Sequence, residues 1–355
     1  MSDERKLKFS IALVPDHPIA DLLEAIELAD KLGYYACYGA DETFHKDCWQ
    51  LFSIAATRTK NIRFGPNVTH VILNDPTLIA QRVATLDEIS NGRAQCGISI
   101  GNFALLDHYR LNDQAKRPMA RLREANQVLR RMLDERAIDF DGEFYRYDGL
   151  FTFAAPVQAR LPVFIGAMLG PKSFQLAGEI ADGMHHAVAY SKQAMDYALD
   201  NVKIGAARAK RDWRDLDLAT LMITCVGADS RAAKDAAHVF AAFYLTAVPP
   251  ALLERHEIAL DDIKATCDAV EAGDIPAAVK ALPKEISDRF SCAGTPDEIV
   301  AKIRDNVVAA NFNHVVFVPA DPFLVRAWSG LSSPRVLDLK GQLQLLHDEV
   351  MPAFA

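Results

Sequence analysis

The chain has 355 residues, half of them hydrophobic and 24% charged, which is the balance of an ordinary globular protein with a large core. The formal net charge of -8 at pH 7 argues against nucleic acid or an anionic membrane as a partner. No apolar run approaches the roughly 18 residues that span a bilayer, and the N-terminal stretch lacks a signal-peptide pattern, so we expect a cytoplasmic chain with no membrane segment.

The first half of the chain alternates between strand and helix patterns. Apolar residues at spacings of three and four predict helices, and β-branched or aromatic runs predict strands. Gly and Pro mark several of the boundaries, with Pro76 at a helix start and Gly33 and Gly92 after helix ends. The expected strands are 8–14, 34–40, 62–68 and 94–101, and the expected helices are 18–32, 47–59, 76–91 and 118–136.

The second half continues the alternation. A hairpin is expected over 137–150, with Asp141-Gly142 as its turn. Strands are expected at 161–167, 183–189, 218–227 and 314–320, and helices at 171–180, 192–210 and 295–310, with a terminal helix that ends near Met351. A long helical insertion over 230–287 separates the seventh strand from the eighth.

Eight strands alternating with helices predict an α/β fold, a single (β/α)8 TIM barrel over residues 1–355 with the insertion 230–287 within it. An open doubly wound sheet is the alternative, but no G-x-G-x-x-G follows the first strand. In a barrel of this kind the active site lies at the carboxyl ends of the strands.

Polar residues do gather at those strand ends. The third strand, in "FGPNVTHVILNDP", ends in Asn67, Thr69 and His70, yet the chain then becomes apolar again. The fourth strand ends in Gly101-Asn102. Polar groups there can face a cavity while their apolar neighbours pack, although loops are also polar simply because they are solvated.

Two adjacent carboxylates, Asp41 and Glu42, follow the second strand and could carry out acid/base chemistry. Adjacent residues of a regular strand point to opposite faces, so one of the two is expected to be structural. Glu42 is the better catalytic candidate, as a general acid whose pKa is raised by a partly dry pocket. The opposing interpretation is that Glu42 caps the next helix or pairs with Lys46 or Arg63.

The histidines His45, His70, His185 and His186 have irregular spacing, with no H-x-x-x-H, and the six cysteines form no C-x-x-C pair. We therefore predict no metal site, and buried reduced thiols. His70 and His185 are candidates for proton handling or substrate contact. The run "GAMLGPKS" is a glycine-bearing strand end that leads into a helix, where N–H groups and the helix dipole favour a phosphate.

Taken together, these segments resemble the luciferase-like flavin and deazaflavin oxidoreductases. The resemblance is carried by "GPNVTHVILNDPTLIAQRVATLDEISNGRAQCGISIGN", with its ATLDE-S-GR element. More narrowly, "PPALLERHEI", "RFSCAGTPDEIVAKI" and "LPVFIGAMLGPKSFQLAGEIADG" resemble the methylenetetrahydromethanopterin reductase branch, which uses the 8-hydroxy-5-deazaflavin coenzyme F-420. The resemblance extends from residue 8 to about residue 318.

The resemblance implies a bacterial luciferase-like TIM barrel with an insertion before strand eight and a non-prolyl cis peptide at Asn67-Val68 that supports the ring of the cofactor. It implies a deazaflavin-dependent oxidoreductase that transfers hydride to or from a small organic substrate, with a pterin as the candidate, in a homodimer or higher homo-oligomer. The predicted catalytic residues are Glu42, His70 and His185. The predicted cofactor-binding residues are Asp41, Asn67, Val68, Thr69, Gly101, Asn102, Gly166, Ala167, Leu169, Gly170 and Lys172.

Three polar positions depart from the pattern of that branch. The strand-one glutamate of that branch is Ala12 here. Many deazaflavin members have Asp-His or Asp-Ser-His after strand two, where this chain has Asp41-Glu42, and many end strand four in Gly-Asp or Gly-Glu, where it has Gly101-Asn102. The scaffold is therefore better supported than the pterin substrate. An FMN-dependent luciferase-like monooxygenase and a non-catalytic deazaflavin- or pterin-binding protein are the alternatives, followed more distantly by a barrel hydrolase that uses Asp41 and Glu42.

Overall fold

The computed structural model describes residues 6–168, 170–187 and 190–355. The chain divides into two compact units. Unit 1 comprises Met1–Ala12, His186–Asp200 and Leu218–Ala355, and unit 2 comprises Leu13–His185 and Asn201–Asp217. Helix α7 (Lys192–Arg208) contributes to both. The expectation of one domain over the whole chain stays a prediction.

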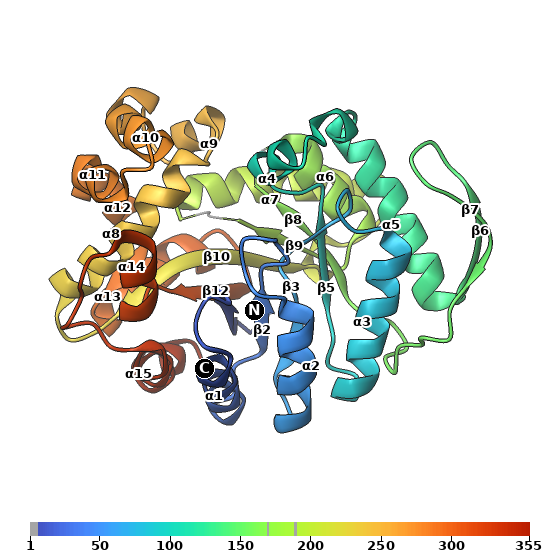
Figure 1. The fold of residues 1–355 in the computed structure, drawn as a ribbon, viewed down its shortest axis with the longest axis horizontal. Coiled ribbons are helices and arrows are strands. Elements are labelled where there is room, and N and C mark those ends of the chain that lie inside the picture. Colours follow the sequence, from blue (N-terminus) through green and yellow to red (C-terminus); the bar gives the residue numbers. More distant parts are fainter. Residues whose placement is uncertain (1–5, 169, 188–189) are drawn as a thin grey trace. The chain divides into compact units, whose positions relative to one another are not determined.

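Unit 2 holds parallel strands that alternate with helices (Figure 1). Its strands are β2 (Ala36–Gly39), β3 (Arg63–Pro66), β4 (Thr69–His70), β5 (Cys96–Ser99), β8 (Val163–Ala167) and most of β9 (Gly183–His186). Its helices are α1 (Ile19–Lys31), α2 (Cys48–Arg58), α3 (Pro76–Ser90), α4 (Phe103–His108), α5 (Pro118–Asp134) and α6 (Pro171–Ile180), with 3-10 turns at Asn112–Ala115 and Trp213–Asp215.

The strand pairings of unit 2 fix where the strands end. Strand β2 pairs with β3 from Ala36↔Arg63 to Gly39↔Pro66, and β5 pairs with both β4 and β8. The third predicted strand is shorter than expected, because it stops at Pro66 and resumes as β4. Polar side chains at the ends of β2, β4 and β5 are therefore expected at one edge of the unit.

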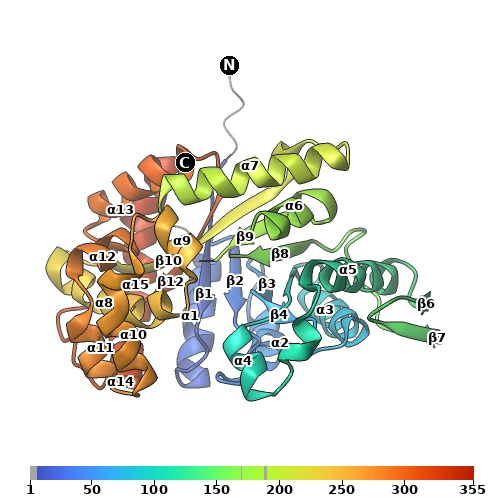
Figure 2. The ribbon, with the colours of Figure 1, turned by 90° about the horizontal axis from the view of Figure 1, so that it is seen from above.

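The predicted hairpin is confirmed as β6 (Ala137–Asp141) paired antiparallel with β7 (Arg146–Phe151). It lies beside α5 in both views (Figures 1 and 2). Two tyrosines connect it to the segment after β4, because the Tyr145 hydroxyl donates to the Val71 carbonyl at 2.7 Å and the Tyr147 hydroxyl donates to the Asp75 carboxylate at 2.9 Å. Asp75 is also the N-cap of α3.

Unit 1 carries β1 (Lys8–Leu13, apart from its last residue), β10 (Asp217–Val226, apart from its first) and β12 (His314–Pro319), with β12 parallel to both. All six residues of β12 are buried, which is typical of a strand covered on both faces. A short strand that the sequence did not predict, β11 (Cys292–Gly294), extends the edge of β10.

The predicted insertion is a set of helices. It contains α8 (Ser230–Thr246), α9 (Pro250–Arg255), α10 (Lys264–Glu271), α11 (Ile275–Ala281) and α12 (Lys284–Arg289), with a 3-10 turn at Leu260–Ile263. Helix α8 contacts α10, α11 and α12, which lie together in both views (Figures 1 and 2). The remaining helices are α13 (Pro296–Lys302), α14 (Pro322–Ser329) and α15 (Leu339–Leu345). Helix α13 continues as the π-helix Ile303–Val308. Helix α15 continues as the π-helix Leu346–Val350 and then as the 3-10 turn Met351–Phe354.

Every cysteine is a free thiol, and Cys267 alone among them is not fully buried. Burial raises the pKa of Cys96 and Cys225 to about 12, so these thiols stay protonated at neutral pH. Within the part of the chain that the structure describes, no helix is both long and apolar enough to cross a membrane.

Candidate functional site at the strand ends of unit 2

Asp41, just beyond β2, is a structural acceptor. Its Oδ2 accepts a hydrogen bond from the Trp49 indole N–H at 3.0 Å and a longer one from the Asn74 amide at 3.5 Å. The cap of α2 is instead Asp47, whose Oδ1 accepts from the backbone N–H of Trp49 at 2.8 Å. The expectation that one of the two adjacent carboxylates is structural is therefore met by Asp41.

Glu42 pairs with His70, 28 positions away in sequence but adjacent in space. Glu42 Oε1 lies 3.4 Å from His70 Nε2, and the two side chains are 20% and 2% exposed. A carboxylate only accepts, so Nε2 carries the proton and donates it. Neither predicted alternative for Glu42, a helix cap or a pair with Lys46 or Arg63, is what the structure contains.

The prediction of a raised pKa for Glu42 was wrong. Burial does push the pKa of this carboxyl upward, but the hydrogen bond and charge of His70, the charge of His45 and a hydrogen bond from Asn102 together outweigh burial and lower it. Glu42 is consequently ionised at neutral pH. A partly dry pocket was expected from the position of Glu42 at a strand end, but the sequence could not show that three polar partners surround the carboxyl.

The far side of the His70 ring packs against Gly101. A Cβ at Gly101 would lie 3.2 Å from His70 Nδ1, and the residue has φ +129°, so the position favours glycine. Within the described chain, His70 Nδ1 is buried and has no hydrogen-bond partner. The next residue, Asn102, caps α4 by accepting from the Ala104 N–H at 3.0 Å.

The predicted cis peptide between Asn67 and Val68 is present and separates β3 from β4. The Asn67 backbone N–H donates to the Gly39 carbonyl at 2.9 Å, and its side-chain amide donates to His185 Nδ1 at 3.1 Å. Val68 lies against β8, because a Cβ built on Gly166 would be 2.5 Å from Val68 Cγ1. Gly166 thus leaves the space that Val68 fills.

His185 lies in the core, although the sequence placed it among the catalytic candidates. It is fully buried, its ring stacks on Phe164 with centroids 3.6 Å apart, and the edge of Tyr38 packs on it at 5.3 Å. Its position suits the support of Asn67 better than contact with a substrate.

The start of α6 follows the end of β8, as the phosphate prediction requires. Gly170 is the N-cap and has no side-chain cap, and a Cβ there would meet nothing within 4 Å. Ser173 turns its hydroxyl back to the Gly170 carbonyl at 2.8 Å. Lys172 is exposed and forms no ion pair with any described residue. Ala167 is buried at the strand end, and Leu169 lies outside the described residues.

Thr69 is held by a residue that the sequence analysis did not single out. The Asn74 amide donates to the Thr69 hydroxyl at 3.3 Å, while Arg82 donates to the Asn74 carbonyl oxygen at 2.8 Å. Asn74 thus links Thr69 to Asp41. The position of Asn74 in the "ILNDP" segment, directly before the helix cap Asp75, is the sequence signal that could have identified it.

The ATLDE-S-GR element proves to be structural. Asp87 is fully buried and accepts from the backbone N–H groups of Ala94, Val157 and Gln158 at 2.8–3.0 Å. The Arg93 guanidinium donates to the carbonyls of Ser90, Ile62 and Ala56 at 2.7–2.8 Å, among other acceptors. These residues fix how α3 joins the strands and lie apart from the chemistry.

Comparison with known proteins gives the scaffold a family. The sequence pattern described as luciferase-like monooxygenase matches residues 7–314. A methylenetetrahydromethanopterin reductase of Archaeoglobus fulgidus is 29% identical over 98% of this chain and 99% of its own. An F-420-dependent glucose-6-phosphate dehydrogenase of Nocardia farcinica is 29% identical over 77% of this chain and 79% of its own.

A solved structure of an F-420-dependent tetrahydromethanopterin reductase from Methanopyrus kandleri superposes with a TM-score of 0.88 at 27% identity, covering 99% of this chain and all of that one. This likeness confirms the predicted luciferase-like (β/α)8 barrel with helices inserted before its last strand. The family match spans residues 7–314, well over half of the 355, so the chain belongs to the luciferase-like monooxygenase family.

Proposed function

We propose that the chain is an oxidoreductase that uses coenzyme F-420 to exchange hydride with a small organic substrate. The observation that carries the proposal is the match, over 98% of the chain, to a reductase of the branch that the sequence already resembled. The named activities of the other relatives support the same cofactor.

Three features of unit 2 fit an elongated anionic cofactor with a planar ring. His70 Nδ1 is a buried polar atom with no partner in the described chain. Gly101 has no Cβ, so its backbone lies close to the His70 ring. The start of α6 and Lys172, which have no side-chain cap and no ion pair among the described residues, offer N–H groups and positive charge to a phosphate.

The chain would hold the ring at the cis peptide Asn67–Val68 between β3 and β4, called here the Asn67–Val68 bulge, and the phosphate at the start of α6. Asp41 would act through the Trp49 side chain, which it holds in place, and Asn102 would act through the start of α4, which it caps. The residues that we propose hold the cofactor directly are Asn67, Val68, Thr69, Gly101, Gly166, Ala167, Gly170 and Lys172, together with Leu169 on the basis of its sequence position.

When bound, the cofactor supplies hydride exchange, and the chain orients the reactants and handles a proton. Because Glu42 is ionised, its carboxylate is suited to accept a proton from a substrate heteroatom as a base when hydride leaves the substrate, and to return that proton when hydride is added, in place of the general acid expected from the sequence. His70 would hold the carboxylate in place by donating from Nε2. His185 would be a positioning residue that acts through Asn67.

An FMN-dependent monooxygenase remains the second candidate, favoured by the name of the matched family. It would require reduced flavin and dioxygen, whereas a deazaflavin transfers hydride. We also propose, from the relatives' names, a pterin as the substrate, and from the sequence a cytoplasmic homo-oligomer. A protein that binds the cofactor without turnover is the remaining alternative.

The decisive experiment titrates the purified chain with oxidised F-420 and with FMN, following quenching of intrinsic tryptophan fluorescence. Reduced F-420 is then mixed with methylenetetrahydromethanopterin, and oxidation of the cofactor is followed by absorbance. F-420 should bind more tightly than FMN and be oxidised in the presence of the pterin. Tight binding of FMN with none of F-420 would overturn the proposal, and F-420 binding without any turnover would favour the non-catalytic alternative.

A further inference from the structure

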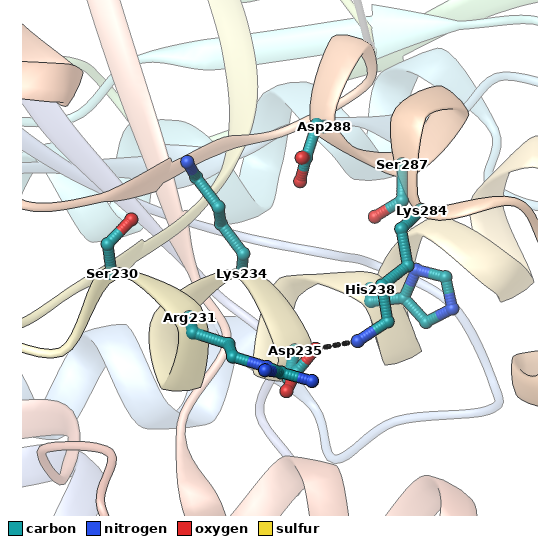
Figure 3. A pocket seen from close by; sticks show the side chains of 8 residues that line it. All are labelled: Ser230, Arg231, Lys234, Asp235, His238, Lys284, Ser287 and Asp288. Atoms are coloured by element: carbon teal, nitrogen blue, oxygen red, sulfur yellow. Dashed lines mark hydrogen bonds and ion pairs between the residues drawn. The ribbon is translucent and has the colours of Figure 1, made fainter.

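A cavity of about 340 Å³ lies between α8 and α12 in unit 1, outside the set of residues assigned to the cofactor. Small-molecule sites occupy roughly 300–1,000 Å³, so the space is large enough for a compact ligand. The side chains of the two helices face each other across it (Figure 3). Its lining is Ser230, Arg231, Lys234, Asp235 and His238 from α8, with Lys284, Ser287 and Asp288 from α12.

Most of the charges in this lining are already paired. Lys284 forms an ion pair with Asp235, drawn as the dashed line in Figure 3. Lys234 donates to Glu298 at 2.7 Å, and that hydrogen bond is the main cause of the raised pKa of Lys234. Among the described residues, the Arg231 guanidinium and the Asp288 carboxylate form no ion pair and no side-chain hydrogen bond, although the charge of Asp288 is near enough to act on the pKa of Lys234 and of Lys302. One positive and one negative group are thus left to meet a ligand.

Two buried polar atoms also lack a partner among the described residues. The Ser287 hydroxyl belongs to a residue that is 1% exposed, and His238 is 6% exposed. His238 Nε2 lies 2.8 Å from the Val279 carbonyl and must donate to it, so Nδ1 of the neutral ring is an acceptor. The Ser287 hydroxyl can donate a hydrogen bond to a negative group of a ligand, and His238 Nδ1 can accept a hydrogen bond from a positive group.

A second cavity of about 490 Å³ adjoins the first and shares Asp235, His238 and Lys284 with it. Its remaining lining is largely aliphatic, with Lys280 from α11 and a few polar or charged groups from the loop after α14. The aliphatic residues are Ala232, Ala236, Val239, Val279, Leu282, Val325, Leu331 and Val336. The two cavities together therefore offer a polar end with both charges and an apolar end.

From these observations we propose that the α8–α12 cleft binds a small zwitterion with an apolar side chain, the class of the aliphatic and aromatic α-amino acids. The ligand carboxylate accepts from Arg231 and the Ser287 hydroxyl, and its ammonium group donates to Asp288 and His238 Nδ1. The side chain occupies the aliphatic cavity beyond the Lys284–Asp235 pair. A simple anion would face the unpaired Asp288, and a simple cation would face the unpaired Arg231.

The test is isothermal titration calorimetry of the full chain with L-leucine and L-phenylalanine. Three comparison compounds each remove one feature: 4-methylpentanoate lacks the ammonium, 3-methylbutylamine lacks the carboxylate, and glycine lacks the side chain. We expect leucine or phenylalanine to bind at least about tenfold more tightly than all three, because each compound leaves a charged or apolar part of the cleft unmatched.

Two variants, Arg231→Gln and Asp288→Asn, should each weaken binding of the better amino acid about tenfold or more. Their matched controls are Arg326→Gln on α14 and Glu285→Gln on α12, which line neither cavity and should leave affinity within about twofold. Thermal unfolding of every variant shows whether it is folded. The proposal is overturned if neither amino acid binds at about 10 mM, if a single-charge compound binds equally well, or if the folded variants bind as the parent does.

Discussion

The contact between Gly166 and Val68 allows a sharp test of the proposed ring support. In Gly166→Ala, the new Cβ would lie 2.5 Å from Val68 Cγ1. Carbon atoms in contact prefer about 3.5–4.0 Å, so one of the two must move by roughly 1 Å. Val68 is a short β-branched side chain with a stiff χ1, and its backbone bulge must therefore take up much of the shift.

Overpacking of this size typically costs about 1–3 kcal/mol. If the shift is borne by the bulge, F-420 affinity should fall by roughly 5- to 100-fold, since each tenfold change in Kd corresponds to about 1.4 kcal/mol. Affinity is measured by fluorescence titration, and the melting temperature is recorded by scanning fluorimetry. Gly227→Ala is the control, because a Cβ there meets nothing within 4 Å and the variant should match the parent.

The double variant Val68→Ala/Gly166→Ala isolates the contact. Removing Cγ1 makes room for the new Cβ, so the second substitution should cost much less in the Val68→Ala background than in the parent, with a coupling of at least about 1 kcal/mol. Additive losses in the double variant, or a Gly166→Ala protein with the parent's affinity and melting temperature, would refute the steric reasoning.

The remaining predictions concern three substitutions that change charges or buried hydrogen bonds. Glu42→Gln should slow hydride transfer about 100-fold in stopped-flow measurements, and a loss within about twofold would remove Glu42 from proton handling. Folding lowers the pKa of Glu42 below its ordinary 4.5. The ionised carboxylate therefore stabilises the folded protein fully above about pH 5, and this contribution is lost as the pH falls through the pKa that Glu42 has in the folded protein. Glu42→Gln should consequently make unfolding less sensitive to acid. Lys172→Glu should weaken F-420 binding more at low salt than at high salt, and equal affinity at both would move the phosphate elsewhere. Asp87→Asn should lower the melting temperature by several degrees. The Asp87 carboxylate accepts hydrogen bonds from three backbone N–H groups, and the amide of Asn can accept fewer of them, so each N–H left without an acceptor costs about 1–3 kcal/mol of stability. An unchanged melting temperature would contradict the structural role of Asp87.

Local signals were enough for most elements. Helix α6 has the predicted bounds, Pro171–Ile180, because both signals for it, a proline at its start and a helical spacing of apolar residues, lie within these ten residues. The hairpin β6–β7 follows in the same way from its Asp-Gly turn. The elements that were missed include α4, β11 and α14, which are short, and short segments carry little periodicity.

The sequence by itself therefore determined the order of strands and helices, the strand ends at which polar groups gather and, through its resemblance, the Asn67–Val68 bulge. Tertiary structure alone decided what those groups do. Glu42 is ionised because His70, from a different strand, donates to it, and Asp87 is structural because Val157 and Gln158 come back to it across 70 and 71 positions. Hydrophobic period is a property of neighbours along the chain, whereas pKa values and buried hydrogen bonds depend on distances in space between residues that the sequence leaves far apart.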